Sequence, residues 1–174
     1  MLGLAKNQNQ NIEELCSALH FETLVGDARD TNFEDASFDL ICSNNTFEHI
    51  YVDVLKNILK EFNRILKPEG VMSHFIDMSD HFSHLDASIS NFNFLKYSNA
   101  EWKFIDNSIQ PQNRLRFIDY IDIYEDLNIN VIKTEYRKGD LEDLKKIKLA
   151  NPFKKYSIDD LLITHGYLVS ASQQ

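Results

Sequence analysis

Ionisable side chains suited to acid–base chemistry and ligand binding follow three short apolar runs of the sequence. Asp27 follows the first run, and Glu48 and His49 lie in the polar loop after the second. The third run leads into the polar stretch 77–84. A histidine titrates near neutral pH, so His49 is a candidate general base, and Glu48 could orient a substrate. The alternative is that Glu48 only starts a helix and His49 packs beneath it.

The elements that must position these residues are strands and a crossover helix. Residues 21–25, 38–42 and 70–76 are apolar runs of strand length, and an amphipathic helix is predicted from Asp53 up to the break at 68–70. This order is typical of a parallel α/β sheet, because parallel neighbours need a long connection. Ligands of such sheets bind beyond the carboxyl ends of the strands, where the ionisable residues lie.

Three motifs in this order resemble class I S-adenosylmethionine-dependent methyltransferases of the type 11 kind. They are GDA at 26–28, FDLICSNNTFEHI at 38–50 and RILKPEGV at 64–71. The resemblance implies a Rossmann-like three-layer α/β sandwich with strand order 3-2-1-4-5-7-6. Its sheet would be mostly parallel, with the last strand, near residues 164–172, antiparallel at the edge.

The resemblance also implies S-adenosyl-L-methionine as the cofactor. It assigns cofactor binding to Asp27, Ala28, Arg29 and Asn44, with the Asp27 carboxylate accepting from the adenine amine and the Ala28 amide donating to the ring. Taken without its context, Asp27 is better explained as a turn residue that caps the next segment, and the ordered motifs around it reverse that preference.

The glycine-rich turn that opens this family does not occur in the sequence, where Gly3 stands alone in MLGLAKNQNQ. We therefore expect a single, partial methyltransferase domain over 1–174 that lacks the first strands. Residues up to about 19 would form the helix before strand 21–25, and that strand would have no partner on its inner edge. Whether such a chain binds cofactor or is active stays open.

Residues 79–113 are expected to form a lid-like insert over the site. Its aromatic residues would supply apolar walls, and Asp80, His81 and His84 would contact the substrate. A metal site is the weaker alternative, considered for the set His74, Asp77, Asp80, His81, His84 and Asp86. Simple methyl transfer needs no Lewis acid, so we expect no metal.

Arg114 and Arg116 precede a predicted helix, where cations oppose the helix dipole. They are candidate ligands for an anionic substrate group, although an internal salt bridge to an aspartate is the favoured alternative.

The net charge of −9 argues against a broad nucleic-acid interface, which needs a basic face. Cys16 and Cys42 lack metal-type spacing and are expected to be reduced. No apolar segment is long enough to span a bilayer and no signal peptide is recognised, so we expect a cytoplasmic protein without a membrane partner.

The sequence thus predicts methyl transfer to a small-molecule or glycan-like acceptor. The alternative is a non-catalytic methyltransferase-like domain that self-associates through an exposed sheet edge. A different nucleotide-dependent enzyme is disfavoured because the chain has no phosphate-binding glycine loop.

Overall fold

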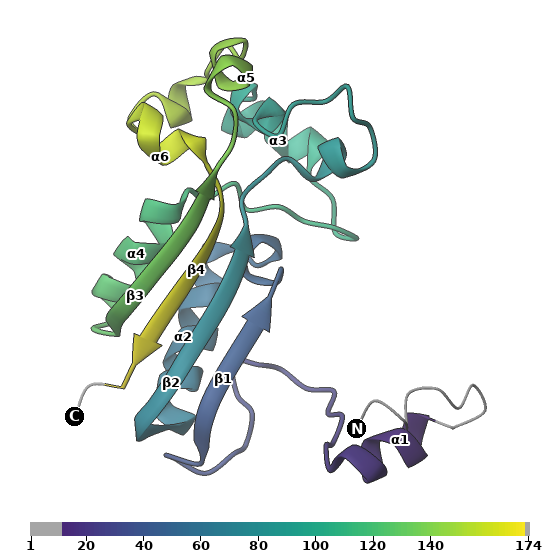
Figure 1. Cartoon of the computed structure of the whole chain (residues 1–174), viewed down its shortest axis with the longest axis vertical. Helices are drawn as coiled ribbons and strands as arrows, with labels where there is room; N and C mark the ends of the chain where they lie inside the picture. Colours follow the sequence, from purple (N-terminus) through teal and green to yellow (C-terminus); the bar gives the residue numbers. More distant parts are fainter. Residues whose placement is uncertain (1–11, 173–174) are drawn as a thin grey trace.

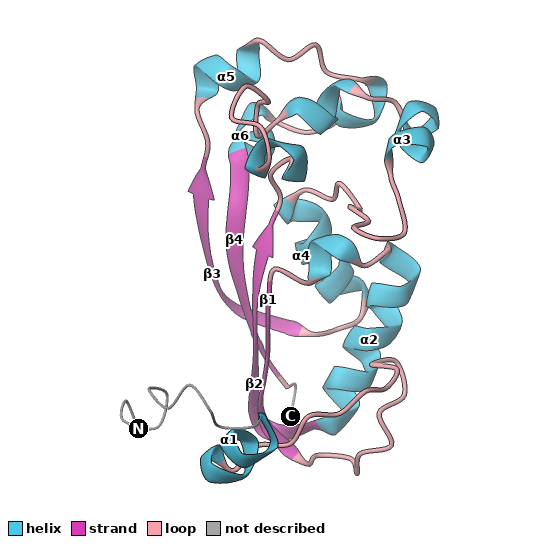
Figure 2. Ribbon diagram, turned by 90° about the vertical axis from the view of Figure 1, so that its right-hand side faces the viewer, coloured by secondary structure: helices cyan, strands magenta, loops and turns pink. Residues whose placement is uncertain are grey.

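The computed structural model describes residues 12–172 as a four-stranded sheet with helices packed on one of its faces (Figures 1 and 2). The sheet order is β1-β2-β4-β3, from β1 (Phe38–Asn44), β2 (Leu66–Asp77), β3 (Asn130–Lys138) and β4 (Ile163–Ala171). β1 and β2 are parallel, and β4 runs antiparallel to both β2 and β3. The expected α/β class is confirmed, but the antiparallel strand lies inside the sheet and β3 forms the edge.

Helices α2 (Val52–Ile65) and α4 (Phe117–Asp126) cover one face of this sheet. The apolar side of α2 buries Leu55 and Leu59 against Met72 and Leu168 of the strands, which forms the main core. Gly166 is required in β4, because a Cβ there would overlap the Phe117 ring of α4. Of the three layers expected, the described residues therefore form two.

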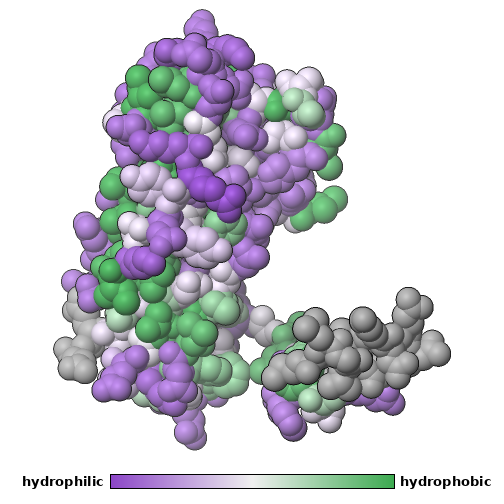
Figure 3. All heavy atoms as spheres, in the orientation of Figure 1, coloured by the Kyte–Doolittle hydropathy of each residue, from purple (hydrophilic) through white to green (hydrophobic). Residues whose placement is uncertain are grey.

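The opposite face of the sheet has no helix packed along it in the part of the chain described. Leu40 and Tyr167 are 58% and 45% exposed there, and Phe75 and Val169 are half-buried beside them. Figure 3 shows apolar side chains gathered over this face. We refer to it as the open face.

The predicted strand at residues 21–25 does not form. Leu24 and Val25 are 69% and 107% exposed, and the segment is extended chain without ladder partners. A strand needs a neighbour to satisfy its amides, so exposure to water is the better state for an unpaired segment. The helix expected before it is confirmed as α1 (Ile12–Leu19), while the earlier part of that prediction, residues 1–11, lies outside the described residues.

A cap lies beyond the carboxyl ends of β1 and β2, as Figure 1 shows. It consists of residues 81–113, which include α3 (Asn99–Ile105), and of residues 139–162, which include α5 (Leu141–Lys145) and α6 (Ile158–Leu162). Both segments share a second apolar cluster around Phe94, Trp102 and Phe153. The first segment covers most of the insert predicted at 79–113, whose role as a lid stays a prediction. The contribution of the second segment was not anticipated. None of the described helices is both long and apolar enough to cross a bilayer.

Candidate functional site

The end of β1 turns sharply into the loop that carries Glu48 and His49. Asn45 adopts a left-handed conformation (φ 49°), which asparagine tolerates, and its amide donates to the carbonyl of Phe75 on β2. The chain then forms a 3-10 turn over Phe47–His49. Asn113 fixes this turn, because its side-chain amide donates to the carbonyls of Phe47 and Ile50, each at 2.8 Å.

Glu48 is buried in this turn without a hydrogen-bond partner. Its residue exposure is 2%, and neither carboxylate oxygen has a partner among the described residues. Burial raises the pKa of Glu48 to about 7, and the negative charge of Asp77 acts in the same direction. The main-chain amides of Glu48 and Asp77 lower the pKa in part, without making a hydrogen bond of good geometry to either carboxylate oxygen. A buried carboxyl with no partner is costly, so something outside this set of side chains is expected to engage it.

His49 lies beside Glu48 and presents one ring nitrogen to the site. Its Nδ1 is 2.7 Å from the carbonyl oxygen of Pro111, a contact in which the nitrogen must be the donor. This fixes Nε2 as the nitrogen that can accept a proton or bind a ligand. The alternative prediction is that His49 only packs beneath a helix. That alternative gives no role to the oriented Nε2 nitrogen.

His81 enters from the end of β2 and completes a group of three. The His49 and His81 ring centroids are 4.8 Å apart, and both ring nitrogens of His81 are buried without a hydrogen bond. Ligand atoms of Glu48, His49 and His81 all lie within 4.8 Å of one another. We call these three residues the tip cluster. Burial lowers the pKa of His81, which favours its neutral form.

Asp77 lies behind the tip cluster, surrounded by three histidines. Its Oδ2 is 3.8 Å from His81 Nε2 and 3.4 Å from His84 Nε2, and its Oδ1 is 3.4 Å from His165 Nε2. Burial would raise the pKa of Asp77, but hydrogen bonds from His165 and Ser79 outweigh it and hold the pKa below its usual range. Asp77 is therefore a carboxylate at neutral pH.

Sequence reasoning did not place His165 in this site. It lies at the start of β4, and the antiparallel register pairs it with Asp77. Only the register of the last strand brings the two together, and a sequence pattern does not fix that register.

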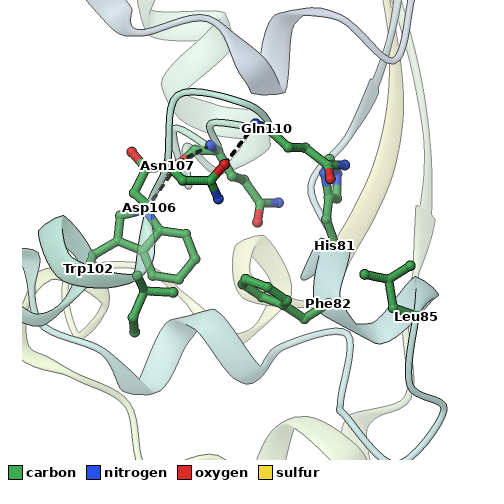
Figure 4. A pocket seen from close by; sticks show the side chains of 9 residues that line it. His81, Phe82, Leu85, Trp102, Asp106, Asn107 and Gln110 are labelled. Carbon is green, nitrogen blue, oxygen red and sulfur yellow. Dashed lines mark hydrogen bonds between the residues drawn. The ribbon is translucent and has the colours of Figure 1, made fainter.

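A small cavity within the cap opens beside His81, the member of the tip cluster that lines it (Figure 4). Its volume is about 40 Å³, and His81, Phe82 and Leu85 face Trp102 and Asp106 across it. The lining is mostly apolar, with polar atoms at one side. Neither Asp27 nor Asn44 is among its lining residues.

The residues predicted to bind cofactor are not gathered at this cavity. Asp27 forms a 2.5 Å ion pair with Arg29 two residues on, and both side chains are about half exposed. Thr31, shortly after them, bonds to Glu61 near the carboxyl end of α2, away from the strand tips. Asn44 does lie at the tip of β1, with its side chain exposed. The described residues thus fit S-adenosylmethionine only in part.

Asp80 and His84 both lie near the site, but they differ in burial and in hydrogen bonding. Asp80 is fully buried; its Oδ1 accepts from the amide of Phe82 and its Oδ2 from the side chain of Asn93. It therefore caps a turn of the insert, and a substrate contact is not supported. The His84 side chain is 51% exposed and lies 3.2 Å from Ser79 Oγ, so it remains available at the rim.

Arg114 and Arg116 hold the cap together. Arg114 donates to the carbonyls of Phe94 and Tyr97 and stacks on Trp102. Arg116, which is 0% exposed, donates to the main-chain carbonyls of Met78, Leu161 and Ile163. Both predicted substrate contacts are therefore corrected. The favoured salt bridge to an aspartate does not form among the described residues either, because the guanidinium groups meet main-chain oxygens and the side-chain oxygen of Asn99.

Comparison with known proteins accords with this geometry. Residues 1–73 match the family described as "Methyltransferase domain", and no curated protein matches the chain. A protein from Pyrococcus horikoshii OT3 is 18% identical, with a TM-score of 0.57, over 92% of this chain and 65% of its own. The fold is that of a class I S-adenosylmethionine-dependent methyltransferase.

Two further methyltransferase structures share this fold. A putative sarcosine dimethylglycine methyltransferase from Galdieria sulphuraria is 16% identical, with a TM-score of 0.57, over 92% of this chain and 64% of its own. The other is geranyl diphosphate C-methyltransferase from Streptomyces coelicolor, in complex with Mg²⁺, geranyl diphosphate and S-adenosyl-L-homocysteine. It is 17% identical, with a TM-score of 0.54, over 91% of this chain and 55% of its own. The chain spans less than two thirds of the length of these methyltransferases.

Proposed function

We propose that this chain carries the acceptor side of an S-adenosylmethionine-dependent methyltransferase that acts on a small-molecule or glycan-like acceptor. The observation that carries the proposal is the tip cluster, a buried and unpartnered carboxyl next to two imidazoles. It lies beyond the carboxyl ends of β1 and β2, where open α/β sheets bind their ligands.

The chain's own residues would bind, orient and deprotonate the acceptor. When bound, S-adenosylmethionine supplies an electrophilic methyl group. An acceptor hydroxyl or amine held at the tip cluster would give its proton to Nε2 of His49, whose Nδ1 is held by Pro111. Phe82 and Trp102 would exclude water from that step. Asn44 and residues 27–29 remain the proposed contacts of the chain with the cofactor.

The proposal is tested with the full chain and S-adenosylmethionine that carries a tritiated methyl group. Small hydroxyl and amine compounds and free saccharides form the acceptor panel. We expect transfer to at least one compound, and we expect His49→Gln to slow it at least about tenfold, within the range typical of lost general-base catalysis. Arg64→Lys, far from the tip, is the matched control. Transfer to no compound at millimolar donor, or an unchanged rate in His49→Gln, would contradict the proposal.

A second candidate function is a methyltransferase-like domain that pairs with another copy of itself. The open face favours it, since Leu40 and Tyr167 are exposed there, and β1 is a sheet edge. Light scattering separates the two candidates: a monomer that transfers methyl groups supports the enzyme, and an inactive dimer that Leu40→Asp dissociates supports the pairing domain.

A further inference from the structure

We propose that the tip cluster is a binding site for one divalent transition metal ion of the zinc class. The proposed ligands are Glu48, His49 and His81. This site differs from the set considered from sequence. A metal ion would occupy Nε2 of His49, so metal binding and the general-base role proposed for that nitrogen exclude each other. Metal binding is therefore tested without any transfer assay.

The donor set has the chemistry of a zinc site that keeps an open position. Two imidazoles and one carboxylate occur as the protein ligands of catalytic zinc sites, and a fourth position is left for water or substrate. Imidazole nitrogen favours Zn²⁺ and its neighbours in the first transition row over Mg²⁺ and Ca²⁺, which prefer oxygen ligands. The small cavity beside His81 would hold the fourth ligand.

The geometry is close to what such an ion needs. Donor atoms of the three residues are within 4.8 Å of one another. The centre of an equilateral triangle with this side is about 2.8 Å from each corner, whereas bonds of Zn²⁺ to nitrogen and carboxylate oxygen are about 2.0–2.2 Å. Movements of well under 1 Å at each side chain would therefore bring the donors to bonding distance.

The missing hydrogen bonds point to the same conclusion independently. Both oxygens of Glu48 and both ring nitrogens of His81 are buried without a partner. Buried polar groups in folded proteins are nearly always satisfied. Single unpartnered atoms occur at four other described residues, but the tip cluster gathers four such atoms at one place, which favours a binding site there. A cation would satisfy Glu48 and one nitrogen of each histidine.

Surrounding residues are arranged as the outer shell of a metal site. His49 donates its Nδ1 proton to the Pro111 carbonyl, and Asp77 lies 3.8 Å from Nε2 of His81. The hydrogen bond to Pro111 orients the His49 ring and fixes its tautomer. Asp77 is too far from His81 for a hydrogen bond, but its negative charge faces that ring. Asn113 holds the turn that carries Glu48 and His49 in place.

The experiment is equilibrium dialysis of the full chain, first freed of metal by chelation, against Zn²⁺ with metal analysis of both compartments. Co²⁺ provides an optical probe of coordination by nitrogen ligands. We expect one Zn²⁺ per chain, retained in millimolar Mg²⁺. Glu48→Gln and His81→Gln are each expected to weaken binding at least about a hundredfold, beyond the loss typical of outer-shell residues.

His84→Gln is the matched control, because His84 is a neighbouring histidine that contacts Asp77 but lies outside the tip cluster. It should bind Zn²⁺ as the unaltered chain does. Circular dichroism of each variant without metal checks that it is folded, and Glu48→Asp gives a second, conservative variant that should retain weakened binding. Absence of stoichiometric Zn²⁺ binding would overturn the proposal. Binding that survives Glu48→Gln and is lost in His84→Gln would also overturn it, since the ion would then lie on Asp77.

Discussion

Two groups of buried ionisable residues in this fold differ in how many hydrogen bonds their side chains make. At the base of the cap, Arg114 and Arg116 donate to five main-chain carbonyls between them. In the tip cluster, Glu48 and His81 have no hydrogen-bond partner for any side-chain nitrogen or oxygen. Single unpartnered atoms occur elsewhere too, including Nε of Arg116. The tip cluster differs because whole side chains lack partners there, which we interpret as a site for a ligand. The predictions below test this distinction.

The largest effect is expected where a satisfied charge is removed. Arg116→Met would leave the carbonyls of Met78, Leu161 and Ile163 buried without donors. At about 1–3 kcal/mol for each orphaned group, the free energy of unfolding should fall by at least about 3 kcal/mol. Urea unfolding followed by circular dichroism measures the loss, with exposed Lys60→Met as control. A change below about 1 kcal/mol would show that these bonds do not hold the cap.

His74 provides a pH-dependent test of the core below the site. It is fully buried, its Nδ1 contacts Ser43 Oγ at 2.7 Å, and burial lowers its pKa to about 4. The unfolded chain binds the proton near pH 6.5, so stability should be full above that pH and fall as the pH drops from 6.5 to 4. The loss attributable to this residue is on the order of 3 kcal/mol.

The contribution of His74 is isolated by comparing the unaltered chain with His74→Phe. Urea midpoints at pH 7.5 and pH 4.5 should diverge less in the variant than in the unaltered chain. An equal difference between the two midpoints in both proteins would mean that the folded core accommodates the proton on His74.

An unsatisfied charge should behave in the opposite way from Arg116. Glu48→Met removes a buried carboxyl that has no partner and replaces it with an apolar side chain of similar length. In metal-free protein at pH 8 we expect an increase in stability of roughly 1–3 kcal/mol. Urea unfolding alongside Arg116→Met gives the comparison directly, because the introduced side chain is the same. A decrease would indicate that Glu48 is structurally satisfied.

The smallest effect is expected at the contact that ties α2 to the cap. Tyr51 OH donates to Asp106 Oδ2 at 2.5 Å at an exposed position, and Asp106 Oδ1 accepts from the amide of Gln112. Tyr51→Phe should lower stability by less than about 1 kcal/mol, as is usual for one exposed hydrogen bond. Amide exchange over residues 106–112 should nevertheless become faster. An unchanged exchange rate would show that the cap is positioned by its apolar cluster alone.

The sequence was sufficient for the elements whose patterns are local. The stripe of α2 and the runs of β1 and β2 follow from spacing, and the polar loops after both strands follow from the end of each apolar run. The strand predicted at residues 21–25 does not form, because an apolar run needs a neighbouring strand, which no local pattern reveals. His165 was missed because its place depends on strand register, and Arg116 was misassigned because carbonyl partners leave no trace in a sequence.

The most direct test of the distinction between satisfied and unsatisfied residues is a side-chain nitrogen NMR spectrum of the histidines in the ¹⁵N-labelled full chain. One equivalent of Zn²⁺ is added to metal-free protein. The account predicts that the imidazole signals of His49 and His81 change together, while those of His74 and His84 keep their positions. Equal changes at all histidines, or changes confined to His84 and His165, would contradict it.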